Sequence, residues 1–369
     1  STPRVSVADL VGWDIAEKVA VRIAGREPFA ESYHADSLAT DFAELTAEAE
    51  ALVTETTGLV PASGPARARV TDRPGWVRAN LASFQRMLAP LTDRLGERMP
   101  GNAVAASATR TVTGVEVGAL LGWMSTRVLG QYDLLIVDDE TAGEQDLVYY
   151  VGPNVLALEK RFGFPPREFR LWLALHEVTH RAQFTGIPWL RGHFLSLVEA
   201  SLGSIEPDPK RFVAALRRAA DEVRAKRNPL DEGGLVALVA TPEQQRLLGR
   251  IGGMMSLLEG HGDITMDRAG ADRIPSADRF SRVLRQRRAQ TSGVAKVVQK
   301  LVGLDAKMKQ YEQGERFIEA IEAEGGPQYL ERAWEGPQWL PDLDEIRDPP
   351  AWMRRVGSPL AGGTAAATA

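Results

Sequence analysis

The sequence predicts an α+β protein that is mostly helical and carries one small sheet. Helical periodicity of the apolar residues runs over about 7–98 and returns beyond residue 278 of the 369-residue chain. Two short runs rich in β-branched and aromatic residues, 132–137 and 146–151, interrupt this pattern. The segment that follows them, 167–185, is again periodic as a helix, so we expect the small sheet to pack on that helix.

Glycines are regularly spaced in the predicted helix over 113–129. Gly114, Gly118 and Gly122 are four residues apart and therefore lie on one ridge of that helix. Such a ridge lets a second helix approach closely, and we expect close helix packing there.

The composition is that of a globular protein and excludes several kinds of partner and site. Hydrophobic residues make up 44% of the chain and charged residues 25%. The net charge of −5 argues against nucleic acid as the main partner. The chain has no cysteine, so any bound metal must be held by histidines and carboxylates. The first residues do not begin a secretory signal and no apolar run has transmembrane length, so we expect a cytoplasmic protein with no membrane partner.

The most informative segment is His176-Glu177-Val178-Thr179-His180, which reads H-E-x-x-H inside the predicted helix. His176 and His180 are four residues apart, so both rings lie on one helical face and can hold one Zn²⁺. Glu177 lies about 100° round the helix, beside the metal, where it can accept a proton from zinc-bound water.

An alternative is that the two histidines are ordinary helix residues. The context argues against it, because Phe169 and Leu173 continue the same stripe and predict that the histidine face is buried. A buried imidazole pair needs polar partners, and a metal satisfies both rings at once. Arg181 and Gln183 follow the motif, and we expect them to orient the helix rather than to contact substrate.

A catalytic zinc has three protein ligands, and two carboxylates are candidates for the third. Glu259 lies on a helix that begins with a capping box at Thr241, and it shares an apolar face with Asp263, which could accept a hydrogen bond from a ligand histidine. A carboxylate on such a face is unfavourable unless it is paired or ligating. Glu199 follows His180 at a separation that some zinc peptidases use, but we expect it to be an exposed helix carboxylate.

Two further side chains are candidates for contacts with substrate. His261 is two residues from Glu259 and points to another face of the helix, so we expect it to bind substrate or the transition state; a structural histidine is the alternative. Tyr311 is the first candidate for a donor to the oxyanion, although core packing is an equal alternative. The strand that carries Tyr149 and Tyr150 could pair with an extended peptide, or be an ordinary sheet strand.

Several segments together resemble a bacterial family of zincin-like metallopeptidases. These segments are His176-Glu177-Val178-Thr179-His180-Arg181-Ala182-Gln183-Phe184, Gly186-Ile187-Pro188-Trp189-Leu190, Leu257-Leu258-Glu259-Gly260-His261 and Lys307-Met308-Lys309-Gln310-Tyr311-Glu312-Gln313-Gly314. The resemblance covers most of the chain except its tail, and some members of the family are linked to biosynthesis of a deazaflavin coenzyme. It implies a zincin fold and a bound metal.

The segment Glu259-Gly260-His261 also resembles the Glu-Gly-Phe segment that supplies the third ligand in gluzincin aminopeptidases. This resemblance favours Glu259 over Glu199 as the third zinc ligand.

The resemblance and the motif suggest a division of the chain into four parts. We expect a helical N-terminal region, a zincin-like metal-binding core, a helical C-terminal region and a disordered tail, at 1–110, 111–270, 271–360 and 361–369.

The expected function is zinc-dependent hydrolysis of a peptide or another amide. Glu177 acts as general base and then as general acid in this reading. The alternative is a zincin-fold protein that binds a partner or takes part in a biosynthesis without peptidase turnover. The intact Glu177 favours the enzyme, because a pure binder has no use for a base at that position.

Overall fold

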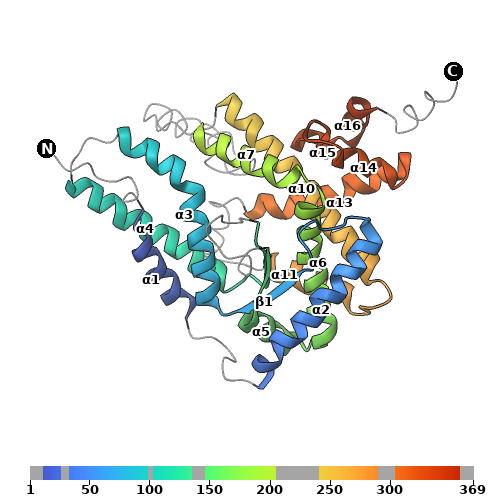
Figure 1. Ribbon diagram of the computed structural model, residues 1–369, viewed down its shortest axis with the longest axis horizontal. Helices are drawn as coiled ribbons and strands as arrows, with labels where there is room; N and C mark the ends of the chain where they lie inside the picture. The colour runs from blue at the N-terminus through green and yellow to red at the C-terminus, as the bar shows by residue number, and fades with distance from the viewer. Residues whose placement is uncertain are drawn as a thin grey trace. The chain divides into compact units, whose positions relative to one another are not determined.

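Most of the residues that the structure describes lie in helices, and one small sheet lies among them (Figure 1). The structure is a computed structural model that describes residues 11–25, 33–98, 103–134, 146–204, 241–289 and 304–357. The predicted fold class, mostly helical α+β, is confirmed. Within the described ranges, no helix combines the length and the apolar character that crossing a bilayer requires.

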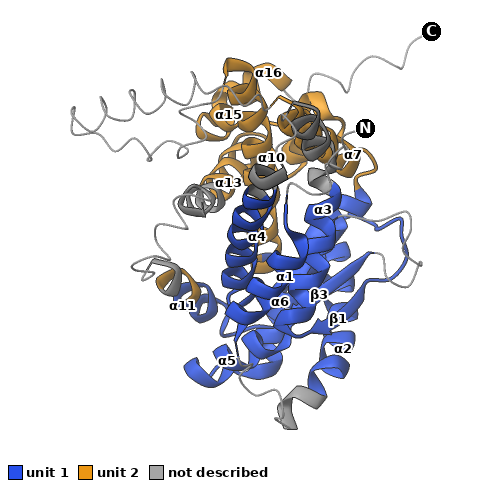
Figure 2. Cartoon of the chain, turned by 90° about the vertical axis from the view of Figure 1, so that its left-hand side faces the viewer, with its two compact units in different colours: residues 1–186, 268–283 blue, residues 187–267, 284–369 orange. Residues whose placement is uncertain are grey.

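Two compact units make up the chain, and their segments interleave in sequence (Figure 2). The first unit comprises Ser1–Gly186 and Arg268–Val283, and the second comprises Ile187–Asp267 and Leu284–Ala369. The predicted disordered tail, 361–369, lies outside the described residues.

The first unit contains the sheet and the helices that cover it. Its elements up to Gly186 are α1 (Trp13–Ala24), α2 (Tyr33–Thr57), β1 (Arg67–Thr71), α3 (Arg73–Arg98), α4 (Ala103–Ser125), β2 (Gly130–Tyr132), β3 (Leu147–Val151), α5 (Gly152–Phe162) and α6 (Pro166–Gly186).

The sheet has three strands in the order β1-β3-β2. β1 is parallel to β3 with Arg69 opposite Tyr149, and β2 is antiparallel to β3 with Gln131 opposite the same Tyr149. Since β3 pairs on both sides, its backbone has no free edge, and the prediction that the strand of Tyr149 and Tyr150 could pair with a peptide is wrong. The edges of the described sheet are β1 and β2.

Two strands differ from the sequence prediction. β1 lies inside the segment that was expected to be helical, because its five residues gain their register only by pairing with β3. β2 begins at Gly130 and ends at Tyr132, so it starts two residues before the predicted run, whose end lies outside the described residues.

The two faces of the sheet have different neighbours. Tyr150 stacks on Phe42 of α2 with ring centroids 3.9 Å apart, and Tyr132 stacks on Phe184 of α6 at 6.4 Å. Residues that alternate with them along the strands point to the opposite face, where Val151 packs with Trp76 of α3. Helices α2 and α6 therefore cover one face, and α3 covers the other.

Helices α1 and α4 approach closely along the glycine ridge, as predicted. A Cβ on Gly118 would lie 2.5 Å from the carbonyl oxygen of Ala16, and one on Gly122 would lie 2.8 Å from that of Ala20. No larger residue fits there without moving one helix away from the other.

The second unit is entirely helical in its described part. Its elements are α7 (Leu190–Gly203), α10 (Pro242–Gly270), α11 (Ala277–Ala289), α13 (Leu304–Gly325), α14 (Gln328–Trp334), η2 (Pro337–Trp339), α15 (Leu343–Arg347) and α16 (Pro349–Val356), of which α10 ends and α11 begins in the first unit. Leu257 of α10 joins a core that contains Phe317, Ile318 and Trp352.

Helix α10 begins as its sequence indicated, and it packs closely on α13. The capping box is present, because Gln244 N donates to Thr241 Oγ1 at 3.1 Å and Thr241 N donates to Gln244 Oε1 at 2.7 Å. A Cβ on Gly260 would lie 2.3 Å from the carbonyl carbon of Gly314 in α13. This close backbone packing compensates for the low helix propensity of glycine.

Alanine should have opposite effects on stability at two helical glycines, one inside the glycine ridge and one outside it. Gly118→Ala should lower the free energy of unfolding by about 1–3 kcal/mol, because its Cβ overlaps α1. Gly249→Ala in α10, where nothing lies within 4 Å, should raise it by about 0.5–1 kcal/mol through helix propensity. Urea unfolding followed by circular dichroism measures both. Equal effects of the two substitutions would show that the ridge is not tightly packed.

Candidate metal centre

Helix α6 carries the H-E-x-x-H segment and is buried along most of its length. Pro166 occupies the first helical position, where its missing N–H is not needed. The carboxylate of Glu168 in the first turn accepts the backbone N–H of Ser276 at 2.9 Å, and Phe169 packs edge-on against Phe280 at 5.2 Å. These contacts fix the start of the helix that positions the histidines.

The two histidines of the motif point their Nε2 atoms at each other. His176 Nε2 and His180 Nε2 are 3.2 Å apart, and their ring planes meet at 87°. Two nitrogens bound at about 2.0–2.1 Å to one tetrahedral zinc ion would lie about 3.3 Å apart. The spacing of the pair therefore fits two ligands of one zinc ion.

Gln183 sets the tautomer of one of these rings. His180 Nδ1 donates to the amide oxygen of Gln183 at 3.0 Å, and Gln183 is fully buried. With its proton on Nδ1, the neutral His180 ring keeps a lone pair on Nε2, the form that binds a metal.

The side chain of Glu177 extends from α6 to strand β2. It is 8% exposed, and its Oε2 accepts the backbone N–H of Tyr132 at 3.1 Å. A Cβ on Gly130 would lie 2.7 Å from Glu177 Oε1 and 2.8 Å from its Cγ, so the side chain packs directly on the glycine. The edge strand thus fixes the carboxylate from one side, and only glycine at 130 leaves room for it.

The phenol of Tyr132 ties the same strand to a buried ion pair. Tyr132 Oη donates to Asp146 Oδ1 at 3.1 Å, and Asp146 pairs with Arg181 at 2.7 Å. Asp146 has φ 55°, a left-handed conformation that aspartate tolerates better than most residues. Tyr132 therefore contacts Glu177 through its backbone and Asp146 through its side chain.

Arg181 connects α6 with three other segments of the first unit. Its guanidinium is fully buried and also bonds Glu50 of α2 at 2.7 Å and the carbonyl oxygen of Gly64 at 2.7 Å. The contacts of Arg181 and Gln183 agree with the expectation that both residues orient the helix.

Tyr150 lies on the same face of the sheet and stays neutral. Burial raises the pKa of its phenol, the hydrogen bond with Thr46 lowers it, and the negative charge of Glu177 raises it further. The phenol shares a 2.8 Å hydrogen bond with Thr46 Oγ1. Tyr150 is therefore a packing residue with a satisfied hydroxyl rather than an anion.

The remaining candidate residues belong to the second unit. Glu259 is 5% exposed on α10, whereas Glu199 on α7 is exposed, as the sequence indicated. His261 is buried, and its ring lies edge-on to Trp334 with centroids 5.5 Å apart. Tyr311 belongs to α13, but its side chain lies outside the described part of the structure.

Sequence reasoning did not identify the residues that hold Glu177 in place. Gly130, Tyr132 and Asp146 are separated from it by more than thirty positions, and none belongs to a recognisable motif. A glycine next to a β-like run was the one local signal, since glycine in a strand often marks close approach of another group.

Comparisons with known proteins are consistent with this arrangement. A family profile described as zincin-like metallopeptidase matches residues 11–353. A crystal structure from Chloroflexus aurantiacus, described as a "putative hydrolase with a novel fold", superposes with a TM-score of 0.69 at 30% sequence identity. The match covers 94% of this chain and 98% of that chain. No curated protein matches the chain.

Removal of Arg181 should destabilise the first unit strongly. Arg181→Met leaves Asp146 buried without its cation, and we expect a loss of about 3–5 kcal/mol in the free energy of unfolding. The matched control on the same helix is Arg167→Met, because Arg167 pairs with Glu48 but is 69% exposed, and its loss should stay below about 1 kcal/mol. Urea unfolding measures both variants, and similar losses would refute the role of the buried pair.

Proposed function

The chain belongs to the zincin-like metallopeptidase family, and from this premise we propose that it is a zinc-dependent hydrolase that cleaves a peptide or another amide bond. The observation that carries the proposal is the 3.2 Å approach of His176 Nε2 and His180 Nε2, with Glu177 in the same helical turn. Two neutral imidazoles and a neighbouring base are the parts that zinc-assisted hydrolysis requires.

We propose Glu259 as the third ligand. His176, His180 and Glu259 are described residues whose ligand atoms could together hold one metal ion, which supports the assignment. Burial of Glu259 and exposure of Glu199 support it as well, because a buried carboxylate needs a cation or hydrogen-bond donors. Two imidazoles with one carboxylate suit zinc better than magnesium or calcium, which prefer oxygen ligands alone.

Each of these residues has a separate role in the proposed reaction. A zinc ion held by His176, His180 and Glu259 would lower the pKa of a water molecule and polarise the carbonyl of the substrate. Glu177 takes the proton from the attacking water and returns it to the leaving nitrogen. The hydrogen bond from Tyr132 N–H to Oε2 holds the carboxylate in one orientation during both transfers.

His261 and Tyr311 remain proposals for contacts with the substrate. The edge-on contact with Trp334 restricts the ring of His261, so it could present one nitrogen in a fixed direction. Tyr311 would serve as a hydrogen-bond donor to the oxyanion that forms as water adds.

Metal analysis tests the ligand assignment. The purified protein should contain about one zinc per chain. Glu259→Ala should lower zinc affinity sharply, because it removes a ligand from a three-ligand set, while Glu199→Ala should leave affinity near that of the wild type. Competition with a chromogenic chelator measures affinity. The reverse pattern would assign the ligand to Glu199 and leave Glu259 as a buried acid.

Replacement of the base separates an enzyme from a binding protein. Glu177→Gln keeps the shape of the side chain but removes its ability to take a proton, so zinc content and fold should be unchanged. Cleavage of any substrate found in a peptide-library screen should fall by about two orders of magnitude or more.

A different outcome would favour the binding module. If the wild type cleaves no member of a broad library and the Glu177→Gln variant binds a partner as well as the wild type does, the hydrolase proposal fails. Zinc content of both proteins serves as the control, because loss of zinc alone would also abolish cleavage.

A further inference from the structure

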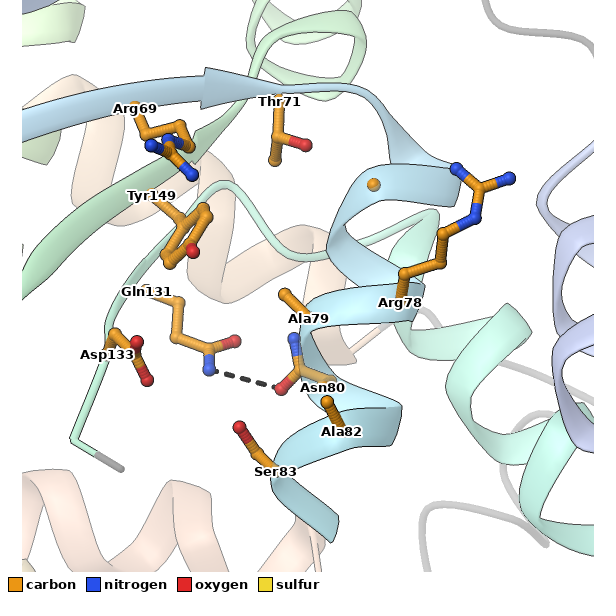
Figure 3. Close-up of a pocket in the computed structure, with 11 residues that line it drawn as sticks. Arg69, Thr71, Arg78, Ala79, Asn80, Ala82, Ser83, Gln131, Asp133 and Tyr149 are labelled. Atoms are coloured by element: carbon orange, nitrogen blue, oxygen red, sulfur yellow. Dashed lines mark hydrogen bonds between the residues drawn. The ribbon is translucent and has the colours of Figure 1, made fainter. Parts of the chain in front are cut away.

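A second polar site lies on the face of the sheet opposite α6. An open cavity of about 360 Å³ lies between the three strands and α3 (Figure 3). The strands contribute Arg69, Gln131 and Tyr149, which stand opposite one another in neighbouring strands and share one face. Glu177 contacts the other face of β2 through Gly130 and Tyr132, so the cavity is separate from the metal centre.

Small side chains on α3 leave this space open. Gly75, Ala79 and Ala82 line the cavity and follow the helical spacing i, i+4, i+7, so they form one face of the helix. The volume falls within the range of small-molecule sites.

Two of the lining side chains, Gln131 and Asn80, belong to a closed ring of hydrogen bonds. Trp76 Nε1 donates to Gln131 Oε1 at 2.8 Å, Gln131 Nε2 donates to Asn80 Oδ1 at 3.1 Å, and Asn80 Nδ2 donates to the carbonyl oxygen of Trp76 at 2.9 Å. Each amide nitrogen carries a second hydrogen that the ring does not use. The ring holds both amides rigidly and leaves them able to donate to a ligand.

Charged side chains line two ends of the cavity. Arg69 comes from β1 and Asp133 follows β2, and β3 separates these two strands. Asp133 also lies two residues along the strand from Gln131, the residue in register with Arg69. At about 4.8 Å per strand spacing and about 3.3 Å per residue, the backbones of Arg69 and Asp133 lie about 12 Å apart, and the length of the arginine side chain shortens the distance between the charges. Arg78 adds a second cation at the rim, where it pairs with Glu17 at 2.9 Å.

We propose that this cavity binds a small zwitterion, a dipeptide, with its carboxylate on Arg69 and its ammonium group toward Asp133. A guanidinium binds a carboxylate through two parallel hydrogen bonds, and the amide hydrogens of Gln131 and Asn80 complete the set of donors. Two residues of extended chain span about 7 Å, and the long side chain of Arg69 covers the rest of the separation between the two backbones. The proposal does not depend on the hydrolase activity.

The test is isothermal titration of the full-length Glu177→Gln protein with the dipeptide alanylalanine. This variant lacks the proposed base, so it should not cleave the dipeptide during the measurement. We expect saturable binding at one site per chain, and binding at least about tenfold weaker for the C-terminal amide of the dipeptide, which lacks the carboxylate.

Three further substitutions locate the ligand. Arg69→Gln and Asp133→Asn should each weaken binding about tenfold or more, since each removes one charge. Ala82→Leu fills the cavity without a change of charge and should also abolish binding, which keeps the test decisive if a charge variant does not fold. Arg285→Gln, at an exposed arginine of α11, is the matched control and should bind as before.

Two results would overturn the proposal. The first is the absence of saturable binding of alanylalanine to the folded protein. The second is binding that survives Arg69→Gln and Ala82→Leu but is lost in His180→Ala, which would place the ligand at the metal centre.

Discussion

The buried guanidinium of Arg181 is the interaction on which the rest of the candidate centre depends. It bonds carboxylates from two other segments, Asp146 before β3 and Glu50 in α2, and lies one residue after His180. The desolvation of such a group offsets most of the attraction to its partners, so the pair adds little net stability. Its effect is positional, because any shift of α6 along the sheet would leave buried charges without partners.

Strand β2 connects the ion pair of Arg181 and Asp146 with the proposed base, Glu177. Tyr132 reaches Asp146 with its hydroxyl and Glu177 with its backbone N–H, while Gly130 leaves room for the carboxylate. Because side chains alternate along a strand, the residue between Gly130 and Tyr132 points to the opposite face of the sheet. Gln131 therefore lines the cavity beside α3, so one short edge strand borders both the candidate metal centre and this cavity.

Glycines act in this protein mainly by their lack of a side chain rather than by unusual backbone angles. Gly118 permits the contact of α4 with α1, Gly260 the contact of α10 with α13, and Gly130 the contact of β2 with Glu177. In each case a Cβ would overlap an atom of the partner segment. Tight packing of this kind makes distances reproducible, which a site that positions two imidazoles and a carboxylate needs.

The sequence by itself determined the helix, the two histidines and the position of the proposed base, because a spacing of four residues fixes which side chains share a helical face. It also determined the capping box at Thr241, which depends only on neighbours in the chain. The partners of Glu177, the strand β1 and the cavity beside α3 were decided by the tertiary structure alone. Strand pairing and buried ion pairs join residues that are distant in sequence, such as Arg181 and Glu50, and no local periodicity records which of them will meet.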